Sequence, residues 1–535
     1  MSCFNALKQG VLAAALLTAL PVAAKTLTVT GVGEPATISS ASCPANICPT
    51  LRDAINAAAS GDTIMFGNAI NGKTILLSLS SNDISAGSIE FGASAFFVTD
   101  GLGETVGKSL TIDGTSHGVT IARDAAATPF RLFDVGSKSS LGLRGLTLRN
   151  GLAQGGNSKG GGGALGAGGA IFNQGALAID ACALVGNSAQ GGSGAIGTGS
   201  ANGGGGAGQD ATSADGGGPN GGMAGSPPRG AGFGGGGGTT LSATDPGGNG
   251  GFGGGGGKGG SGIGGGTGGF GGGGGSDAFL PGNGGFGGGV AGGDFDHVPN
   301  GGGGGGMGGA IFNDAGTVTL TNTTFYENSA TGGNTTYGGT AVAGGNGSGF
   351  GGAIFNYAGT LSASFVTLAG NSTATGTGGA GGGTDGGAIY SHADSACGTS
   401  DGNICTTGDA DLSMVNSVAA RSVGSAHDIV VDNSGGTSAS NGSGNLIMTQ
   451  SGFAGTFISS DPKLGALSPY AAGPAPATLP ISAASPAYNA AASCNDAKNQ
   501  TVVNDQRGKS RPLAGTCDIG AYEFDNDYIY ANSYE

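Results

Sequence analysis

The chain has 535 residues, of which 125 are glycine, 10% are charged and none is tryptophan. Glycine stands several times above its usual share of about 7%, which disfavours an ordinary helical or doubly wound enzyme. The formal net charge is −15, with 19 basic residues. That balance argues against nucleic acid or an anionic membrane as a partner, because both bind clustered lysine and arginine.

The N-terminal stretch has the three parts of a secretory signal. Lys8 supplies a positive charge, residues 11–20 form a short apolar run, and Val22-Ala23-Ala24 offers small side chains for cleavage. The apolar run falls short of the roughly 20 residues that span a bilayer. We therefore expect residues 1–24 to be a signal peptide and the mature chain to be exported, with no transmembrane segment.

Seven cysteines follow the expected cleavage site, and six of them form three couples that are close in the sequence. In an oxidising compartment such couples favour disulfides, and their spacing does not match a zinc site. The disulfide candidates are Cys43 with Cys48, Cys397 with Cys405, and Cys494 with Cys517. Cys182 is left over and is interpreted as a small buried apolar residue.

Residues 50–59 carry the signals of a short helix. Thr50 and Asp53 have the spacing of a capping box, and Leu51, Ala54, Ile55 and Ala58 form an apolar face. An open stack of β-strands needs its ends covered. We expect this helix to lie across the first coil.

The string GGAIFN occurs at 168–173, 308–313 and 351–356, and an altered copy, GGAIY, at 386–390. Each copy opens a unit of about 22 residues with three short strands, and Val318 and Leu320 alternate with threonines at period two, which indicates β-structure. Such a unit buries its apolar face only when it is stacked on its neighbours. The fold class predicted is all-β, a right-handed parallel β-helix (solenoid) with a short N-terminal capping helix and a long glycine-rich insertion.

Two columns of asparagine follow from this stacking. Aligned amides can hydrogen-bond along a stack, so we interpret these residues as structural ladders rather than as ligand contacts. The members are Asn173, Asn313 and Asn356 in one column and Asn187, Asn328 and Asn371 in the other.

The domain boundaries follow from where the repeats stop. Segments between the hexapeptides all leave from one corner of the coil, and loop closure costs little extra entropy as length grows. The predicted parts are a signal peptide (1–24), an N-terminal cap with the first coils (25–187), a glycine-rich insertion (188–307), C-terminal coils (308–460), a C-terminal cap (461–524) and a short tail (525–535).

The glycine-rich insertion repeats a phenylalanine at positions 233, 252, 270 and 286, each followed by glycines. Low apolar content and high glycine favour disorder. The regular phenylalanine spacing favours an alternative, a bundle of polyglycine-II strands with three residues per turn, stapled by those rings. The sequence is compatible with both a disordered insertion and an ordered polyglycine-II bundle.

Three local strings resemble known families. CPTLRDAI followed by GDTIMF resembles the CSLREA segment that opens bacterial secreted β-helix proteins, from which Pro49-Thr50 and Asp53 depart. SDPKLGAL, SPAYNAA and DQRGKSRPLAGTCDIGAYE resemble the choice-of-anchor Q domain that closes such helices. The GGAI strings, with FYEN at 325–328, are similar to repeats of polymorphic outer-membrane proteins, although we expect no translocator barrel after Glu523. The resemblance implies a protein of the bacterial cell surface, cell outer membrane or extracellular space.

Right-handed β-helices also build pectate lyases and polygalacturonases, whose sites need clustered carboxylates on adjacent coils. The motif SHG at 116–118 is similar to a polygalacturonase element, but its partner motifs are missing, and His117 is interpreted as a turn residue. The four histidines lack metal-ligand spacing, and Arg507, Arg511 and Glu523 are expected to brace the C-terminal cap. The charged concentration on the early coils comprises Asp113, Arg123, Asp124, Arg131, Asp134, Arg144 and Arg149, which solvated strand faces explain.

The function predicted is non-catalytic: adhesion, or a structural role in the extracellular matrix, with surface glycans or other cells as partners. We expect no catalytic residue, no metal and no cofactor. One alternative is a polysaccharide lyase or glycoside hydrolase of the pectin-lyase-like β-helix class. A second is a purely structural surface protein.

Overall fold

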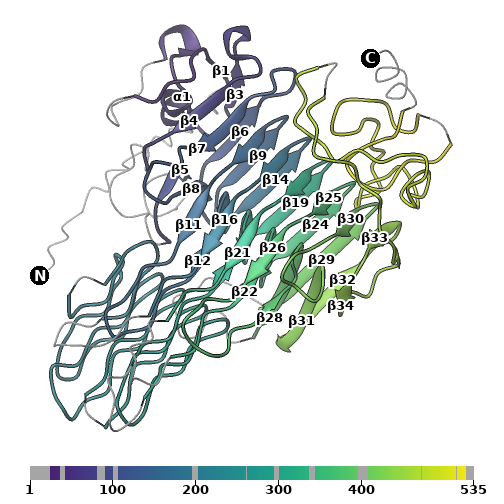
Figure 1. Ribbon diagram of the computed structural model, residues 1–535. Helices are drawn as coiled ribbons and strands as arrows, with labels where there is room; N and C mark the ends of the chain where they lie inside the picture. The colour runs from purple at the N-terminus through teal and green to yellow at the C-terminus, as the bar shows by residue number, and fades with distance from the viewer. Residues whose placement is uncertain are drawn as a thin grey trace, which may run out of the picture.

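The computed structural model describes residues 24–35, 43–80, 91–99, 107–194, 203–211, 213–260, 262–293, 300–335, 344–395, 408–470, 473–513 and 515–525. Within these ranges the chain forms a right-handed parallel β-helix, so the predicted fold class is confirmed. Figure 1 shows the rungs stacked from the N-terminal cap to the last coil, with glycine-rich strands projecting from one edge and the C-terminal chain lying along another. The expected signal peptide, apart from Ala24, and the tail after Asp525 lie outside the described residues.

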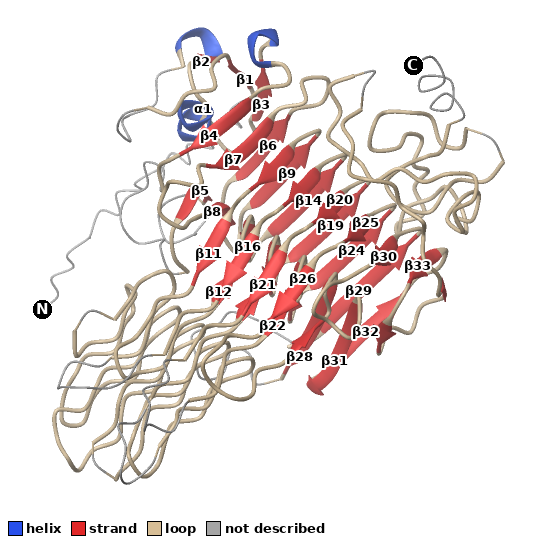
Figure 2. Cartoon of the chain, viewed as in Figure 1, coloured by secondary structure: helices blue, strands red, loops and turns tan. Residues whose placement is uncertain are grey.

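Three long sheets form the faces of the β-helix, and Figure 2 shows their strands side by side. Sheet A comprises, in spatial order, β2 (Ile47–Cys48), β1 (Thr26–Val29), β3 (Thr63–Phe66), β6 (Ser109–Asp113), β9 (Ser140–Arg144), β14 (Ala176–Asp180), β19 (Thr317–Thr321), β24 (Thr360–Ser364), β29 (Ala410–Val415) and β32 (Ser438–Asn441). Sheet B comprises β35 (Phe457–Ile458), β33 (Asn445–Ile447), β30 (Val418–Ala420), β25 (Thr367–Ala369), β20 (Thr324–Tyr326), β15 (Ala183–Val185), β10 (Thr147–Arg149), β7 (Thr120–Arg123) and β4 (Thr74–Leu77). Sheet C comprises β34 (Gln450–Ser451), β31 (Ile429–Gly435), β28 (Ile389–Asp394), β23 (Ile354–Tyr357), β18 (Ile311–Asp314), β13 (Ile171–Asn173), β8 (Arg131–Val135) and β5 (Ser94–Val98).

Two short sheets mark the edge where the chain leaves and re-enters the coils. Sheet D comprises β11 (Leu152–Gln154), β16 (Ser188–Gln190), β21 (Ser329–Thr331) and β26 (Ser372–Ala374). Sheet E comprises β12 (Gly166–Ala167), β17 (Gly306–Met307), β22 (Gly349–Phe350) and β27 (Thr384–Asp385). Each full coil therefore has five strands, whereas the sequence predicted three.

The hexapeptides lie directly on one another. Ile171, Phe172 and Asn173 pair in parallel register with Ile311, Phe312 and Asn313, which pair in turn with the same triplet in β23. The isoleucines are fully buried inside the β-helix together with the alternate apolar residues of sheets A and B. The stacked isoleucines are part of the main core, which fills the inside of the β-helix.

The N-terminal end is covered by α1 (Leu51–Ala57), with the short 3-10 turns η1 (Pro44–Asn46) and η2 (Asn68–Ile70) beside it. Thr50 is the helix N-cap, and its Oγ1 accepts a hydrogen bond from the Asp53 amide at 3.1 Å. Leu51 and Ile55 are buried against the first coil, so the expected capping helix is confirmed. Arg52 is buried too and bonds Glu34, which the apolar pattern did not reveal.

The C-terminal end differs from the sequence expectation. Phe453 and Phe457 close the core of the last coil. Residues 461–524 instead pack along the outer face of sheet B, where Leu464 and Ile519 meet Phe365 and Leu446. The Asn322 side chain on an earlier coil donates to the Asn504 carbonyl at 3.0 Å. The segment predicted as an end cap is thus a brace along the side of the β-helix (Figure 1).

Candidate functional site

The repeated hexapeptide serves two separate cores. Successive side chains of a strand point to opposite faces, so Ile311 lies inside the β-helix while Phe312 lies outside sheet C. Outside sheet C the rings stack in a ladder. Neighbouring centroids from Phe172 to Phe312, Phe355 and Tyr390 are 5.5, 5.3 and 5.3 Å apart.

A second ladder comes from the glycine-rich insertion. The rings of Phe233, Phe252, Phe270 and Phe286 stack with centroid distances of 5.1, 5.0 and 5.3 Å. Each phenylalanine precedes a glycine with φ between 72° and 79°, as at Gly253. The amide two residues after each phenylalanine bonds the carbonyl three residues earlier, so these are turns of type II, which need glycine at the left-handed position.

The two ladders pack against each other. Phe252 meets Phe312 edge-on at 6.4 Å, and Phe270 meets Phe355 in the same way at 6.1 Å. Phe91 extends the contact by stacking on Phe172 at 4.3 Å. This shared apolar cluster attaches the glycine-rich insertion to the outer face of sheet C. Sequence reasoning foresaw a phenylalanine-stapled bundle but not its partner.

Arg131, one of the charged residues singled out in the sequence, lies fully buried beside this cluster. Its guanidinium donates to the carbonyls of Phe91 and Ala167 and lies over the Phe172 ring at 5.4 Å. Burial lowers the pKa of Arg131 to about 10, opposed by Asp134 at 3.6 Å. Arg131 therefore holds Phe91 and the Phe172 end of the ladder on sheet C, and it is not part of a solvent-facing site.

The insertion is built as a lattice of glycine backbones. In one strand, the amides of Gly255, Gly256 and Gly257 donate to the carbonyls of Gly205, Gly273 and Gly248, on three different neighbours. Three directions in three residues is the geometry of polyglycine II. The described part of the insertion is therefore ordered in this way, and the disordered alternative does not hold there.

Close packing explains why so many of these positions are glycine. A Cβ on Gly255 would lie 2.0 Å from the Gly162 carbonyl oxygen, and one on Gly162 would lie 1.8 Å from that of Gly273. No side chain fits in such a gap, because the obstructing atoms belong to the backbone.

The segments that leave the coils together form one bundle of four layers, which we call the glycine bundle. Residues 229–232, 247–251, 265–269 and 282–285 form the first layer, and residues 235–238, 254–257, 272–275 and 288–289 the second. Residues 161–163, 203–206, 301–304 and 344–347 form the third, and residues 191–194, 332–335 and 376–379 the fourth. The short excursions thus extend the same lattice as the long insertion, which explains why all of them leave from one corner.

Asparagine and threonine occupy the outward positions of the two outer layers. In the first layer Asn249 Oδ1 accepts from the Thr267 amide at 3.0 Å. In the fourth, Asn334 Oδ1 accepts from the Thr377 amide at 2.8 Å. These side chains pair with outward amides that have no further layer to bond.

The loops at the distal end of the bundle expose large apolar side chains. They connect the strands at the end opposite the phenylalanine turns, far from the β-helix (Figure 1). The most exposed is Leu241, at 64%. The set comprises Met223, Leu241, Ile263, Phe279, Leu280 and Val290. These six are the large apolar side chains that the described part of the insertion leaves exposed.

The charged residues on the early coils are mostly dispersed. Arg144 joins Asp113 at 3.8 Å and Asp180, on the next coil, at 3.4 Å. Arg123 instead bonds the Asn150 carbonyl, and Arg149 is exposed on β10. Asp124 caps its own turn at Ala126. Beside the Arg144 group, the outer face of sheet A carries an open groove of about 530 Å³ lined largely by Ser, Thr, Ala and Gly.

The histidines take separate structural positions. His117 Nδ1 lies 3.0 Å from the Thr115 carbonyl in a turn, as expected. His392 Nδ1 contacts Asp432 at 2.9 Å and its ring stacks on Phe286 at 4.0 Å. His427 Nδ1 contacts Asp385 at 2.9 Å, and His297 lies outside the described residues. In the described ranges no group of three or more His, Cys, Asp and Glu side chains is arranged to hold a metal ion.

Both asparagine columns are hydrogen-bonded ladders in the structure. Asn173 donates to Asn313, and Asn313 to Asn356, each at 2.7 Å. In the second column the distance between successive members is 2.9 Å, from Asn187 to Asn328 and on to Asn371. All six residues are fully buried.

Two of the expected disulfides lie in the described residues, Cys43–Cys48 and Cys494–Cys517. Cys397 and Cys405 lie outside them. Cys182 is a buried free thiol, as expected, and burial raises its pKa to about 12.

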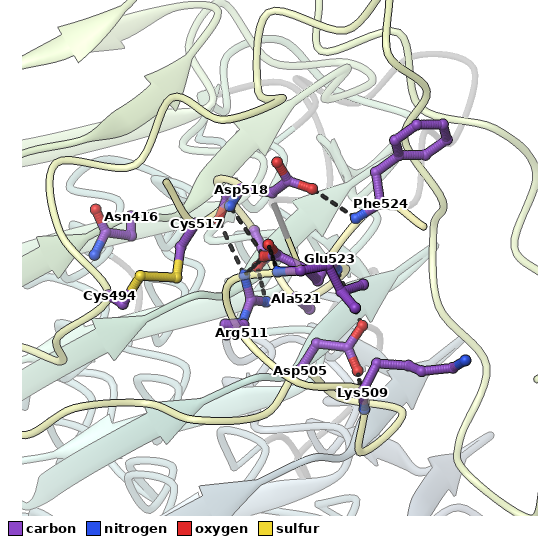
Figure 3. Close-up of polar contacts among 12 residues, drawn as sticks. Asn416, Cys494, Asp505, Lys509, Arg511, Cys517, Asp518, Ala521, Glu523 and Phe524 are labelled. Carbon is purple, nitrogen blue, oxygen red and sulfur yellow. Dashed lines mark hydrogen bonds and ion pairs between the residues drawn. A yellow bond between two sulfur atoms is a disulfide. The ribbon is translucent and has the colours of Figure 1, made fainter. Parts of the chain in front are cut away.

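The C-terminal brace is held by a buried charge network, drawn in Figure 3. Arg511 Nη1 donates to Glu523 Oε2 at 2.9 Å, and that oxygen also accepts from the Asp518 amide at 3.0 Å. Arg507 Nε bonds Asp505 Oδ2 at 2.8 Å. The expected bracing role of these residues is confirmed. Burial raises the pKa of Asp518 to about 6, although the amides of Asn489 and Phe524 donate to its carboxylate.

No protein-family model matches the chain. No curated protein matches it either. The crystal structure of pectate lyase Pel9A is similar to it with a TM-score of 0.28 and 11% sequence identity, over 94% of this chain and 96% of that chain. None of the helices in the described ranges has the length and apolar character needed to cross a membrane.

Proposed function

We propose that this chain is an exported, non-catalytic protein of the bacterial cell surface or extracellular matrix that adheres through the distal loops of its glycine bundle. The carrying observation is the row of exposed apolar side chains at that end, which no other part of the described chain covers. A rigid β-helix and a backbone lattice hold these loops at a fixed distance from the core. Contact by apolar side chains also suits a protein whose net charge of −15 repels other acidic surfaces.

Two further observations support export. The disulfides Cys43–Cys48 and Cys494–Cys517 suit an oxidising compartment. The N-terminal string resembles that of CSLREA proteins, and the C-terminal string resembles the choice-of-anchor Q domain, whose proteins are secreted. We propose membership of this group on those strings, with residues 1–24 as the signal peptide.

The adhesive role is tested by replacing Leu241, Ile263, Phe279 and Leu280 together with serine. Beads coated with the mature chain should adhere to bacterial or host cells, and the quadruple variant should lose most of that adhesion. The matched control replaces four exposed apolar residues elsewhere, Ile47, Leu76, Val503 and Leu513, with serine. Equal adhesion by the loop variant and the unaltered chain would contradict the proposal.

A specific observation favours an enzymatic alternative. Arg144 lies between carboxylates of two other coils, Asp113 and Asp180, beside the open groove on sheet A. Glycosidases use a pair of carboxylates that flank the scissile bond. Release of reducing or unsaturated ends from pectin or alginate, abolished by Arg144→Ala, would establish this activity. With neither turnover nor adhesion, the purely structural role would remain.

A further inference from the structure

A second surface of the glycine bundle is shaped to receive a ligand. A groove of about 550 Å³ opens where the first glycine layer meets the end of β28. Its walls include Asn249, Thr267, Phe286 and, from the β-helix, Asp394. It is separate from the distal loops, and we call it the seam groove.

The seam groove offers hydrogen-bonding groups that the fold leaves available. Within the described residues, the carbonyl oxygens of Ala231, Gly250 and Gly268, which line it, accept no hydrogen bond. The Thr267 hydroxyl and the Asn249 side chain are exposed in the same groove. Acceptors therefore outnumber donors, which suits a ligand rich in hydroxyl groups.

These groups recur with the step of the lattice. Ala231, Gly250 and Gly268 hold equivalent places, each two residues before a phenylalanine of the insertion. The rings of those phenylalanines, Phe233, Phe252 and Phe270, are 5.1 and 5.0 Å apart. That step is close to the advance of one sugar unit in an extended pyranose chain. A polymer lying along the groove would meet the same acceptors at successive units.

The charge of the groove disfavours one class of polymers, the acidic polysaccharides. Asp394, whose Oδ2 accepts from the Tyr357 hydroxyl at 2.9 Å, places a carboxylate in the lining of the groove. An acidic polysaccharide would be repelled there. The two faces of Phe286 are covered by Phe270 and His392, so the ring offers its edge and not a stacking platform. Recognition would then rest mainly on hydrogen bonds.

We infer that the seam groove binds a neutral polysaccharide chain, lying across successive hairpins of the first glycine layer. This goes beyond the proposed adhesion by the distal loops, because it concerns other residues and another chemistry.

The test measures binding of the mature chain to soluble hexasaccharides of β-1,4-glucan, β-1,4-mannan and α-1,4-glucan by titration calorimetry. At least one of the two β-1,4 chains, which are extended, should bind, and the coiled α-1,4-glucan should not. Thr267→Tyr, which fills the groove from an exposed position, should weaken binding roughly tenfold or more, about 1.4 kcal/mol. Asp394→Asn keeps an acceptor for Tyr357 and should weaken binding less.

The matched control is Thr377→Tyr, an equivalent outward threonine on the opposite layer of the bundle, which should bind as the unaltered chain does. The serine variant of the distal loops should also bind the hexasaccharide, so the two proposals fail separately. The inference is overturned if no hexasaccharide binds, if Thr267→Tyr and Thr377→Tyr weaken binding equally, or if hexaglycine displaces the saccharide as an added strand.

Discussion

The β-helix and the glycine bundle are both stacks of repeats, yet their stability comes from different parts of the chain. In the β-helix, side chains such as Ile311 fill the core and the backbone only pairs the rungs. In the bundle, the backbone forms the contacts in three directions, and interior glycines such as Gly255 and Gly162 leave no room for a Cβ. Substitutions should therefore act in opposite ways on the two sides of the Phe312 ladder. In the β-helix, removing side-chain atoms is destabilising, and in the bundle, adding them is.

The largest expected effect is the addition of one methyl group inside the bundle. Gly255→Ala would place its Cβ 2.0 Å from the Gly162 carbonyl oxygen, so backbone must move. We expect a loss of more than about 4 kcal/mol of bundle stability, because overpacking against backbone cannot relax through rotamers. Limited proteolysis should then cut residues 203–293 while the β-helix stays intact.

Its control is Gly230→Ala in the first layer, where the nearest obstructing atom is 3.6 Å from the added Cβ. This variant should stay within about 0.5 kcal/mol of the unaltered chain. Equal sensitivity of the two variants to protease would contradict the lattice.

The next effect separates the two cores with adjacent residues of one strand. Ile311→Ala removes a side chain from inside the β-helix, and Phe312→Ala removes its neighbour from the ladder outside. Each should cost about 3–5 kcal/mol by cavity formation. Hydrogen exchange should locate the losses differently. Ile311→Ala should lower protection in sheets A to C, and Phe312→Ala should lower it in the glycine bundle. The same exchange pattern for both would mean that the cores are not distinct.

A moderate effect distinguishes the bundle from the other lateral attachment, the C-terminal brace. The pKa of Asp518 is raised from 3.8 to about 6 by burial, so the folded state holds this proton more tightly than the unfolded state. Stability must therefore fall as pH rises from about 4 to about 6, by up to about 3 kcal/mol, and stay lower above that range. Residues 259–276 of the bundle carry no ionisable side chain and should show no such dependence.

Urea unfolding at about pH 4 and pH 7 checks this, with Asp518→Asn expected to flatten the slope. Asp411→Asn, at an exposed position on sheet A, is the control and should leave the slope unchanged. A brace that becomes more stable as pH rises through this range would contradict the sign.

The stacked register of the coils could be predicted because it depends on side chains that form a repeated pattern. Asparagine and isoleucine recur at fixed places in the hexapeptide, and the alternation around Val318 identifies strands, so the stacked register followed. The polyglycine-II bundle was one of two alternatives that the phenylalanine spacing left open. Which of its strands are neighbours could not be predicted, because glycine has no side chain that would mark a partner. The contact of Phe252 with Phe312 joins segments far apart in the chain, each of which carries only its own spacing. Residues 461–524 were predicted to be an end cap because their strings resemble a domain that closes β-helices. That resemblance does not indicate which face of the β-helix the segment covers.

The smallest effect probes the boundary of the lattice itself. At the outer layers the bundle must end, and there the side chain of Asn249 takes the place of a further strand by accepting from the Thr267 amide. Asn249→Ala should cost only about 0.5–1 kcal/mol, because the freed amide is exposed and water can bond it. Asn334→Ala on the opposite layer should cost the same, since it frees the Thr377 amide in the same way.

Thermal unfolding of both variants and of their double mutant should give additive losses. These sites are separated by two glycine layers, and distant positions couple weakly. Strong coupling between them would mean that the layers transmit strain as side-chain cores do, and the contrast between backbone and side-chain stacking would then fail.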